Sequence, residues 1–166
     1  EFDTVTWDRL KRIDVSEDFG VWKEYAVRRG VHPSIISFLE YETDKFYKIQ
    51  KTVDGTEFVT ARGWVDLSDI IYLYERHRET DDSFVVDEDL ISQYLQSRSV
   101  AREFASYYEL FNKYKATYQL QEILNGDKNE EIVHRAKEAK AFERYSIISL
   151  IVSILCTNLK ELYSTR

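Results

Sequence analysis

The sequence predicts a mainly helical fold with one inserted β-hairpin. Its 166 residues include only five Gly and one Pro, which are too few turn formers for a many-stranded β architecture. Hydrophobic residues make up 43% of the chain and aromatic residues 14%, enough to build a core. Apolar residues recur mostly at intervals of three and four, and they alternate in a single stretch around an Asp-Gly pair. We therefore expect five or six helices and one hairpin.

Two helices are expected ahead of the hairpin. Residues 1–15 show no clean period, although residues 13–15 permit a short strand. Ser16 is the expected N-cap of the first helix, which Gly30 ends. Pro33 then starts a second, short helix, because proline is tolerated in the first helical turn. The apolar residues that mark the buried sides of the two helices are Phe19, Trp22, Tyr25, Ala26, Ile35, Ile36 and Leu39.

The period changes from helical to alternating around Asp54-Gly55, the strongest short hairpin signal in the chain. The predicted hairpin spans about residues 46–60. An isolated hairpin is marginal in water, so it must lean on the helices or on another chain. Thr60 can cap a third helix over about residues 61–77. Its apolar face consists of Trp64, Leu67, Ile71 and Tyr74.

The second half of the sequence is predicted to be helical throughout. Asp87 is expected to cap a fourth helix that carries Leu90, Ile91, Tyr94 and Leu95. The clearest apolar stripe follows and defines one face of a long helix. Asn125-Gly126 ends that run, and a last helix is expected over about residues 129–163. The stripe consists of Val100, Phe104, Tyr107, Tyr108, Phe111, Tyr114 and Tyr118.

Charge and cysteine content narrow the class of protein. The chain has 23 basic and 30 acidic residues, a net charge of −7, so we expect no nucleic-acid partner. The single Cys156 excludes an intramolecular disulfide and a cysteine-based zinc cluster, and a cytoplasmic location is expected. The apolar stretch Ile147–Cys156 is too short to span a bilayer, so it predicts a buried helix segment and no membrane partner.

No complete catalytic site is visible in the sequence. His32, His77 and His134 lack the spacing that places two metal ligands on one helical face, so no metal site is expected. There is no Gly-rich P-loop, so the chain cannot hold nucleotide phosphates by itself in that manner. A carboxylate active site would depend on residues that meet only in space, and nothing in the pattern favours one.

Arg62 is the unusual charge of the sequence. It lies in the predicted first helical turn, where a cation is mildly unfavourable beside the positive end of the helix dipole. It also points away from the apolar face of that helix. Two interpretations remain open: Arg62 meets an anion there, or it forms an i,i+4 pair with Asp66.

Three segments of the sequence resemble motifs of a known family. They occur in the same order as in that family and at plausible spacing. The string FVTARGWVDLSDIIYLYE, Phe58 to Glu75, resembles the sensor-2 region of MoxR-like AAA+ ATPases. WDRLKRIDV, Trp7 to Val15, is similar to the end of the ATPase core in that family. WKEYAVRRGVHPSIISFLEY, Trp22 to Tyr41, is similar to its first lid helices. The resemblance is best over roughly residues 7–125, and residues 126–166 match no motif of the family.

The resemblance implies specific roles for three arginines. Arg62 would be the sensor-2 arginine that contacts the γ-phosphate, and Arg9 would reach a neighbouring subunit's nucleotide as an arginine finger. Leu10 stands where the family often has Phe, and Arg12 is a rival of Arg9 for that role. ATP and Mg²⁺ would be bound by the parent protein, not by this chain alone. The chain contains no Met, and we expect it to be a piece of a longer protein.

The fold class implied is a multi-helix bundle like an AAA+ lid, with the inserted hairpin and an extra C-terminal helix. Residues 1–15 would end the ATPase core, 16–125 would form the lid, and 126–166 a helical extension. The implied partners are the ATPase core, neighbouring subunits and a client protein of a chaperone-like oligomeric machine that hydrolyses ATP. The alternative is a helical interaction module without a nucleotide role, in which part of the tyrosine-rich stripe forms a partner groove. We favour the interpretation of that stripe as core, because apolar stripes at helical spacing usually are.

Overall fold

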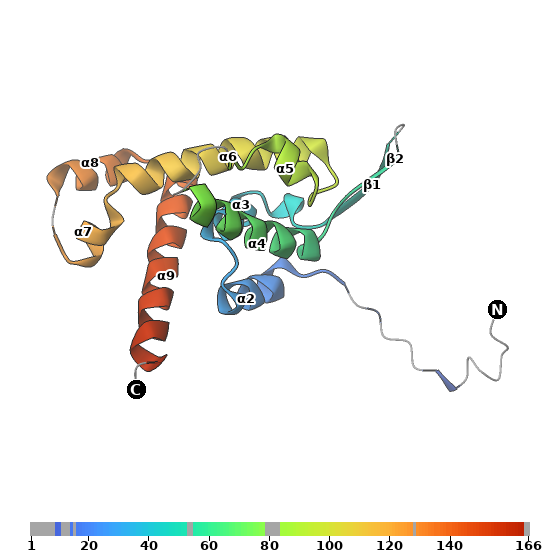
Figure 1. Cartoon of the computed structure of the whole chain (residues 1–166), viewed down its shortest axis with the longest axis horizontal. Helices are drawn as coiled ribbons and strands as arrows, with labels where there is room; N and C mark the ends of the chain where they lie inside the picture. The colour runs from blue at the N-terminus through green and yellow to red at the C-terminus, as the bar shows by residue number, and fades with distance from the viewer. Residues whose placement is uncertain are drawn as a thin grey trace.

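The computed structural model describes residues 9–10, 14, 16–52, 55–78, 84–127 and 129–164. Within these residues the protein is mainly helical with one two-stranded antiparallel sheet, as predicted. Figure 1 shows the hairpin projecting from one side of the helices and the last helix descending on the other side. The described ranges contain eight α-helices, more than the five or six expected. The strand expected at residues 13–15 and the centre of the hairpin turn, residues 53–54, lie outside them.

Helix α2, Phe19–Arg29, begins two residues later than predicted. Asp18, not Ser16, is the N-cap, and its carboxylate accepts a hydrogen bond of 3.0 Å from a first-turn amide. The physical reason is packing, because the ring of Phe19 lies 5.6 Å from that of Phe46. The predicted stop is confirmed: Gly30 adopts the left-handed conformation with φ 77°.

Three helices build the centre of the core. Helix α3, Pro33–Tyr41, is buried from Pro33 to Leu39, and it packs between α4, Ala61–Arg78, and α6, Arg98–Thr117. Phe38, Trp64 and Phe104, one from each helix, have ring centroids 5.3 to 5.8 Å apart. The predicted stripe on α6 is therefore core. Its fully or nearly buried members are Val100, Phe104, Tyr107, Tyr108, Phe111 and Tyr118.

The hairpin is tied to the helices at its base. A short 3-10 helix, Thr43–Lys45, precedes strands β1, Lys48–Thr52, and β2, Gly55–Val59. The strands pair antiparallel. The amide of Phe58 donates to the carbonyl of Gln96 at 3.0 Å, just before α6 begins. This bridge supplies the support from the helices that a lone hairpin needs.

The short helices after α4 follow the prediction only in part. Asp87 caps α5, Glu88–Ser92, by accepting from a backbone amide at 2.9 Å, as expected. Helix α5 ends before Tyr94 and Leu95, which were predicted to lie within it. Another short helix, α7, Leu120–Leu124, separates the end of α6 from the Asn-Gly turn.

The single last helix predicted over residues 129–163 is wrong. The structure has two helices, α8, Glu130–Glu138, and α9, Ala141–Ser164. Ala139 and Lys140 separate them, and Ala139 is extended, with φ −58° and ψ 138°. Ala139 is a good helix former, so packing overrides propensity here. The ring of Phe142 lies 4.4 Å from that of Tyr107, which sets the direction of α9, whereas α8 contributes no buried residue.

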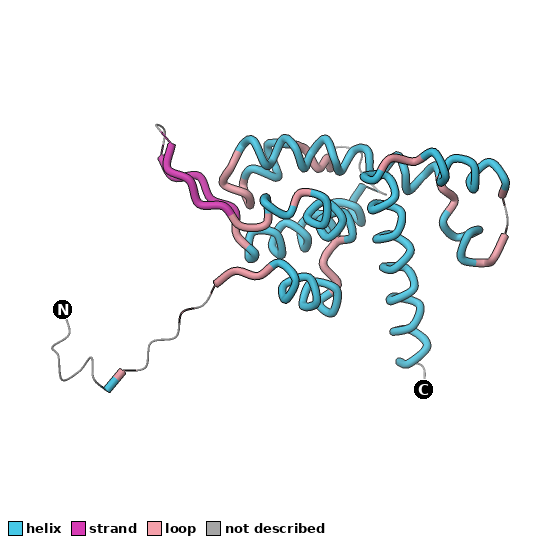
Figure 2. The backbone as a smooth tube through the Cα atoms, turned by 180° about the vertical axis from the view of Figure 1, so that it is seen from behind, coloured by secondary structure: helices cyan, strands magenta, loops and turns pink. Residues whose placement is uncertain are grey.

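Helix α9 packs on α3 through serines. The hydroxyl of Tyr107 donates to Ser37 Oγ at 2.5 Å and lies 2.8 Å from Ser146 Oγ, while Ser149 donates to the carbonyl of Pro33 at 3.1 Å. Figure 2 shows α9 from behind, crossing the other helices near its start and standing clear of them towards its C-terminal end. The prediction that Ile147–Cys156 is buried therefore holds for one face only.

None of the described helices is both long enough and apolar enough to cross a membrane.

Candidate functional site

The first turn of α4 is anchored at both ends. The amide of Gly63 donates to Thr60 Oγ1 at 3.2 Å, so Thr60 is the cap that the sequence predicts. Trp64 is fully buried, and its Nε1 donates to the carbonyl oxygens of Lys45 and Phe46 at 3.3 and 3.2 Å. The turn is thus tied to the segment that leads into the hairpin.

Gly63 lets this turn lie against the backbone that follows α5. A Cβ atom at position 63 would come 2.7 Å from the carbonyl oxygen of Tyr94, closer than real Cβ contacts. The absence of a side chain therefore sets how closely the start of α4 approaches its neighbour.

Arg62 lies between these anchors and points into solvent. Its side chain is 89% exposed, and its Nε lies 3.5 Å from Asp66 Oδ2. The structure thus contains the i,i+4 pair that the sequence offers as one of two interpretations. Pairs this exposed are weak, so Arg62 can exchange Asp66 for another anion without loss of a buried contact. A fixed backbone that carries an exposed guanidinium is suited to receive a phosphate.

The other arginines with predicted roles are less defined. Arg9 is among the few described residues ahead of α2, and its side chain is exposed. Arg12, its rival, lies outside the described residues. The arginine-finger assignment stays a prediction.

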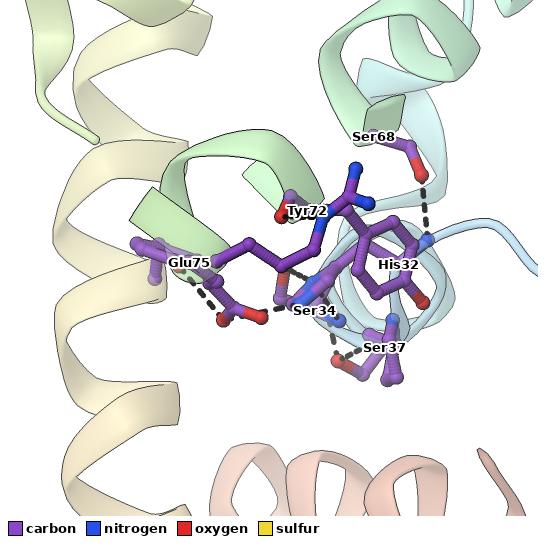
Figure 3. A network of polar contacts seen from close by, with 9 residues as sticks. His32, Ser34, Ser37, Ser68, Tyr72 and Glu75 are labelled. Carbon is purple, nitrogen blue, oxygen red and sulfur yellow. Dashed lines mark hydrogen bonds and ion pairs between the residues drawn. The ribbon is translucent and has the colours of Figure 1, made fainter. Parts of the chain in front are cut away.

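A buried polar network that the sequence analysis missed surrounds His32 (Figure 3). The amide of His32 donates to Ser68 Oγ at 2.8 Å, and its Nδ1 lies 2.7 Å from Ser34 Oγ. Its Nε2 lies 3.4 Å from Glu75 Oε1, and its ring packs edge-on against Tyr72 at 4.8 Å. The network joins the start of α3 to the middle of α4.

Glu75 carries the charge of this network. Burial raises the pKa of its carboxyl, but the hydrogen bond and charge of His32, the charge of Lys115 and the Tyr108 hydroxyl at 3.0 Å outweigh it and lower the pKa to about 2. Burial, and then the charge of Glu75, raises the pKa of Tyr108. Near neutral pH the pair therefore consists of a carboxylate acceptor and a phenol donor.

The order Ser34–His32–Glu75 resembles the connectivity of a hydrolytic triad, but its burial argues against catalysis. Ser34 is fully buried and His32 is 2% exposed, so a substrate cannot reach the hydroxyl. The amide of Ser34 also donates to His32 Nδ1 at 3.3 Å, which occupies the nitrogen that would act as base. We interpret the network as a structural link between α3 and α4.

Glu75 also reaches a groove of about 760 Å³ between α4 and α6. Its walls combine aromatic rings with charges of both signs, including Tyr72, Tyr74, Glu75, Phe84, Tyr108 and Lys115. No sequence signal could have found this groove, because its residues come from separate elements that only the fold brings together. Among the described residues, no group of three or more His, Cys, Asp or Glu side chains could hold a metal ion.

Comparisons of the chain with protein-family models, with curated proteins and with solved structures found no match.

Proposed function

We propose that this chain is the lid part of a MoxR-like AAA+ ATPase, in which Arg62 completes a nucleotide site formed with an ATPase core. The proposal rests on one observation: Arg62 is 89% exposed, yet it stands on a turn fixed by Thr60, Gly63 and Trp64. A guanidinium carried on a fixed backbone and free of buried contacts is available to stabilise charge on a transferred phosphoryl group. Arg9 would act in the same way on a neighbouring subunit's nucleotide.

A hollow beside this turn supports a nucleotide over inorganic phosphate. Ala61, the neighbour of Arg62, lines a hollow of about 540 Å³ together with Trp22, Tyr25 and Phe46. Glu17 and Asp18 also line this hollow, so its aromatic wall suits the flat apolar part of a nucleotide, and Arg62 outside the lining would receive the anionic part. Within the described part of the chain, Trp22 Nε1 is a buried donor without an acceptor. This chain supplies the cation and the aromatic wall, whereas Mg²⁺ would be held by the core.

The remaining parts of the proposal follow from the same resemblance. The helices and the hairpin form a lid-like bundle, and the hairpin, which projects from it, contacts subunits or a client protein in a chaperone-like oligomer in the cytoplasm. Because Arg62 would contact the nucleotide, hydrolysis of ATP would change the angle between the lid and the ATPase core.

The alternative of an interaction module without a nucleotide role stays a prediction. The tyrosine-rich stripe does not supply its partner groove, because the stripe is buried in the core except for the partly buried Tyr114.

The test is ATP turnover by the full-length protein that carries this chain. Arg62→Ala should lower turnover at least about tenfold, because arginines that complete phosphate sites contribute at least this much. The matched control is Arg28→Ala, since Arg28 is 79% exposed and pairs with Glu24 at the same i,i+4 spacing. Turnover of the control should stay near wild type.

Two results would contradict the proposal. One is equal turnover and nucleotide affinity in Arg62→Ala and wild type. The other is a full-length sequence that encodes no phosphate-binding loop.

A further inference from the structure

Helix α9 is apolar on two adjoining faces. Its inner face packs on the core through Leu150, which is 4% exposed, with Ile147, Ile151 and Ile154 partly buried beside it. Its outer face carries a row of large apolar side chains that the described core leaves exposed. The row, termed here the outer seam, consists of Tyr145, Ile148, Val152, Leu155 and Leu159, with exposures of 41, 59, 45, 45 and 52%.

The outer seam has the spacing of a coiled coil. Its members follow one another at steps of three, four, three and four residues, the a and d positions of a heptad repeat. The central pair, Val152 at an a position and Leu155 at a d position, favours two-stranded pairing, whereas Ile148 at d and Leu159 at a do not share this preference. The 24 residues of α9 span about 36 Å, room for three heptads. Such a seam fits a second helix with the same repeat.

The charge distribution makes the outer seam the place where two copies of this chain can meet. The chain has a net charge of −7, so most faces of two copies repel each other. From Tyr145 to Leu159 there is not a single charged residue, so two outer seams can meet without opposing like charges. The same neutral seam on both partners gives the self-complementary contact of a twofold dimer.

A pocket beside the seam extends the contact surface. It has a volume of about 330 Å³ and lies between α9 and helices α2 and α3. Ile148, Val152 and Cys156 line it from α9, and Val27 and Ile36 line it from the other side. Lys23 and Glu40, which pair with each other, also line this pocket. Apolar side chains of a helix laid on the outer seam can enter the pocket beside Ile148 and Val152.

We infer that two copies of the chain associate through the outer seam of α9. This inference is independent of the nucleotide role of Arg62, because α4 begins beside the hairpin and α9 lies across the bundle from it (Figures 1 and 2).

The experiment is light scattering coupled to size-exclusion chromatography of the whole chain over a wide range of concentration. Wild type should reach twice the 19.8 kDa of one chain. Leu155→Glu and Leu155→Lys should each have the mass of a single chain. In a dimer of either variant, two like charges would be buried close together in the seam. Their equimolar mixture should recover the dimer, which an unfolded variant could not do.

The matched control is Val21→Glu on α2, since Val21 is 70% exposed but lies off the seam. This variant should dimerise as wild type does. A single-chain mass for wild type at the highest concentration would overturn the inference whatever the variants do. Equal dissociation of Val21→Glu and Leu155→Glu would also overturn it.

Discussion

Single residues determine where the turn that carries Arg62 lies. Thr60 caps the turn, Gly63 allows it to approach the backbone at Tyr94, and Trp64 fixes it in the core. Each acts through a different physical property: a hydrogen-bond acceptor, the absence of a Cβ and a large buried ring. Arg62 itself contributes little to the fold, because its ion pair with Asp66 is exposed.

Gly63→Ala should destabilise the protein by about 1–3 kcal/mol, because the new Cβ meets a backbone oxygen that cannot rotate away. The matched control is Gly20→Ala in the first turn of α2, where the nearest atom is the side-chain Oδ1 of Asp18 at 3.2 Å. That variant should stay within about 1 kcal/mol of wild type, because the helix preference of Ala offsets the small shift it forces on the capping oxygen of Asp18. Urea unfolding measures both, and equal effects would contradict the close approach at Gly63.

Glu75 should make stability depend on pH in the acid range. Its pKa is about 2 in the folded protein against an ordinary 4.5, so the unfolded state binds the proton more readily. The resulting stability is fully present above about pH 4.5. It is lost as the pH falls through the folded pKa of about 2. The contribution of Glu75 to the free energy of unfolding is roughly 1–2 kcal/mol, a value reduced for solvent screening because its side chain is 28% exposed.

Glu75→Gln should remove this part of the acid dependence. The measurement is urea unfolding of the variant and of wild type at about pH 7, 4 and 3. The stability that Glu75 contributes changes over roughly this range. Glu109→Gln, an exposed position on α6, should retain the wild-type dependence. If Glu75→Gln and wild type lose stability in parallel on acidification, the coupling of Glu75 to His32 is absent.

Among the elements, α6 shows most clearly how a periodic pattern becomes a core. Its stripe was predicted residue by residue, because a spacing of three and four residues places side chains on one face in any helix. Whether that face meets α3 and α4 or a partner protein is not contained in the spacing. In the structure the rings of Phe38 and Trp64 pack against Phe104, so this face of α6 meets α3 and α4.

Phe104→Ala should cost about 3–5 kcal/mol, because Phe104 is fully buried and its loss leaves a cavity. Leu110→Ala on the same helix should cost less than about 1 kcal/mol, since Leu110 is 41% exposed. Chemical denaturation of the two variants decides the point. Similar small losses would mean that the stripe of α6 is not core.

In the whole molecule, the two proposed contact regions lie apart. The turn that carries Arg62 lies beside the hairpin, and the outer seam runs along α9 on the other side of the helices (Figure 1). Their effects should therefore add without coupling.

Arg62→Ala should leave the mass of the chain in light scattering unchanged, since Arg62 does not belong to the seam. Leu155→Glu should leave the stability effect of Gly63→Ala unchanged, which a double-mutant cycle in urea measures. A coupling above about 0.5 kcal/mol would show that the two regions are linked through the fold.

The sequence by itself determined the helical class, the hairpin, the caps at Thr60 and Asp87, and the stop at Gly30, because local periodicity and backbone preferences decide these features. It also singled out Arg62, whose nucleotide role stays a prediction. Only the tertiary structure decided the break at Ala139, the His32–Glu75 network and the exposure of one face of α9. These depend on contacts between residues distant in the chain, and the energy of such contacts cannot be read from neighbours in sequence.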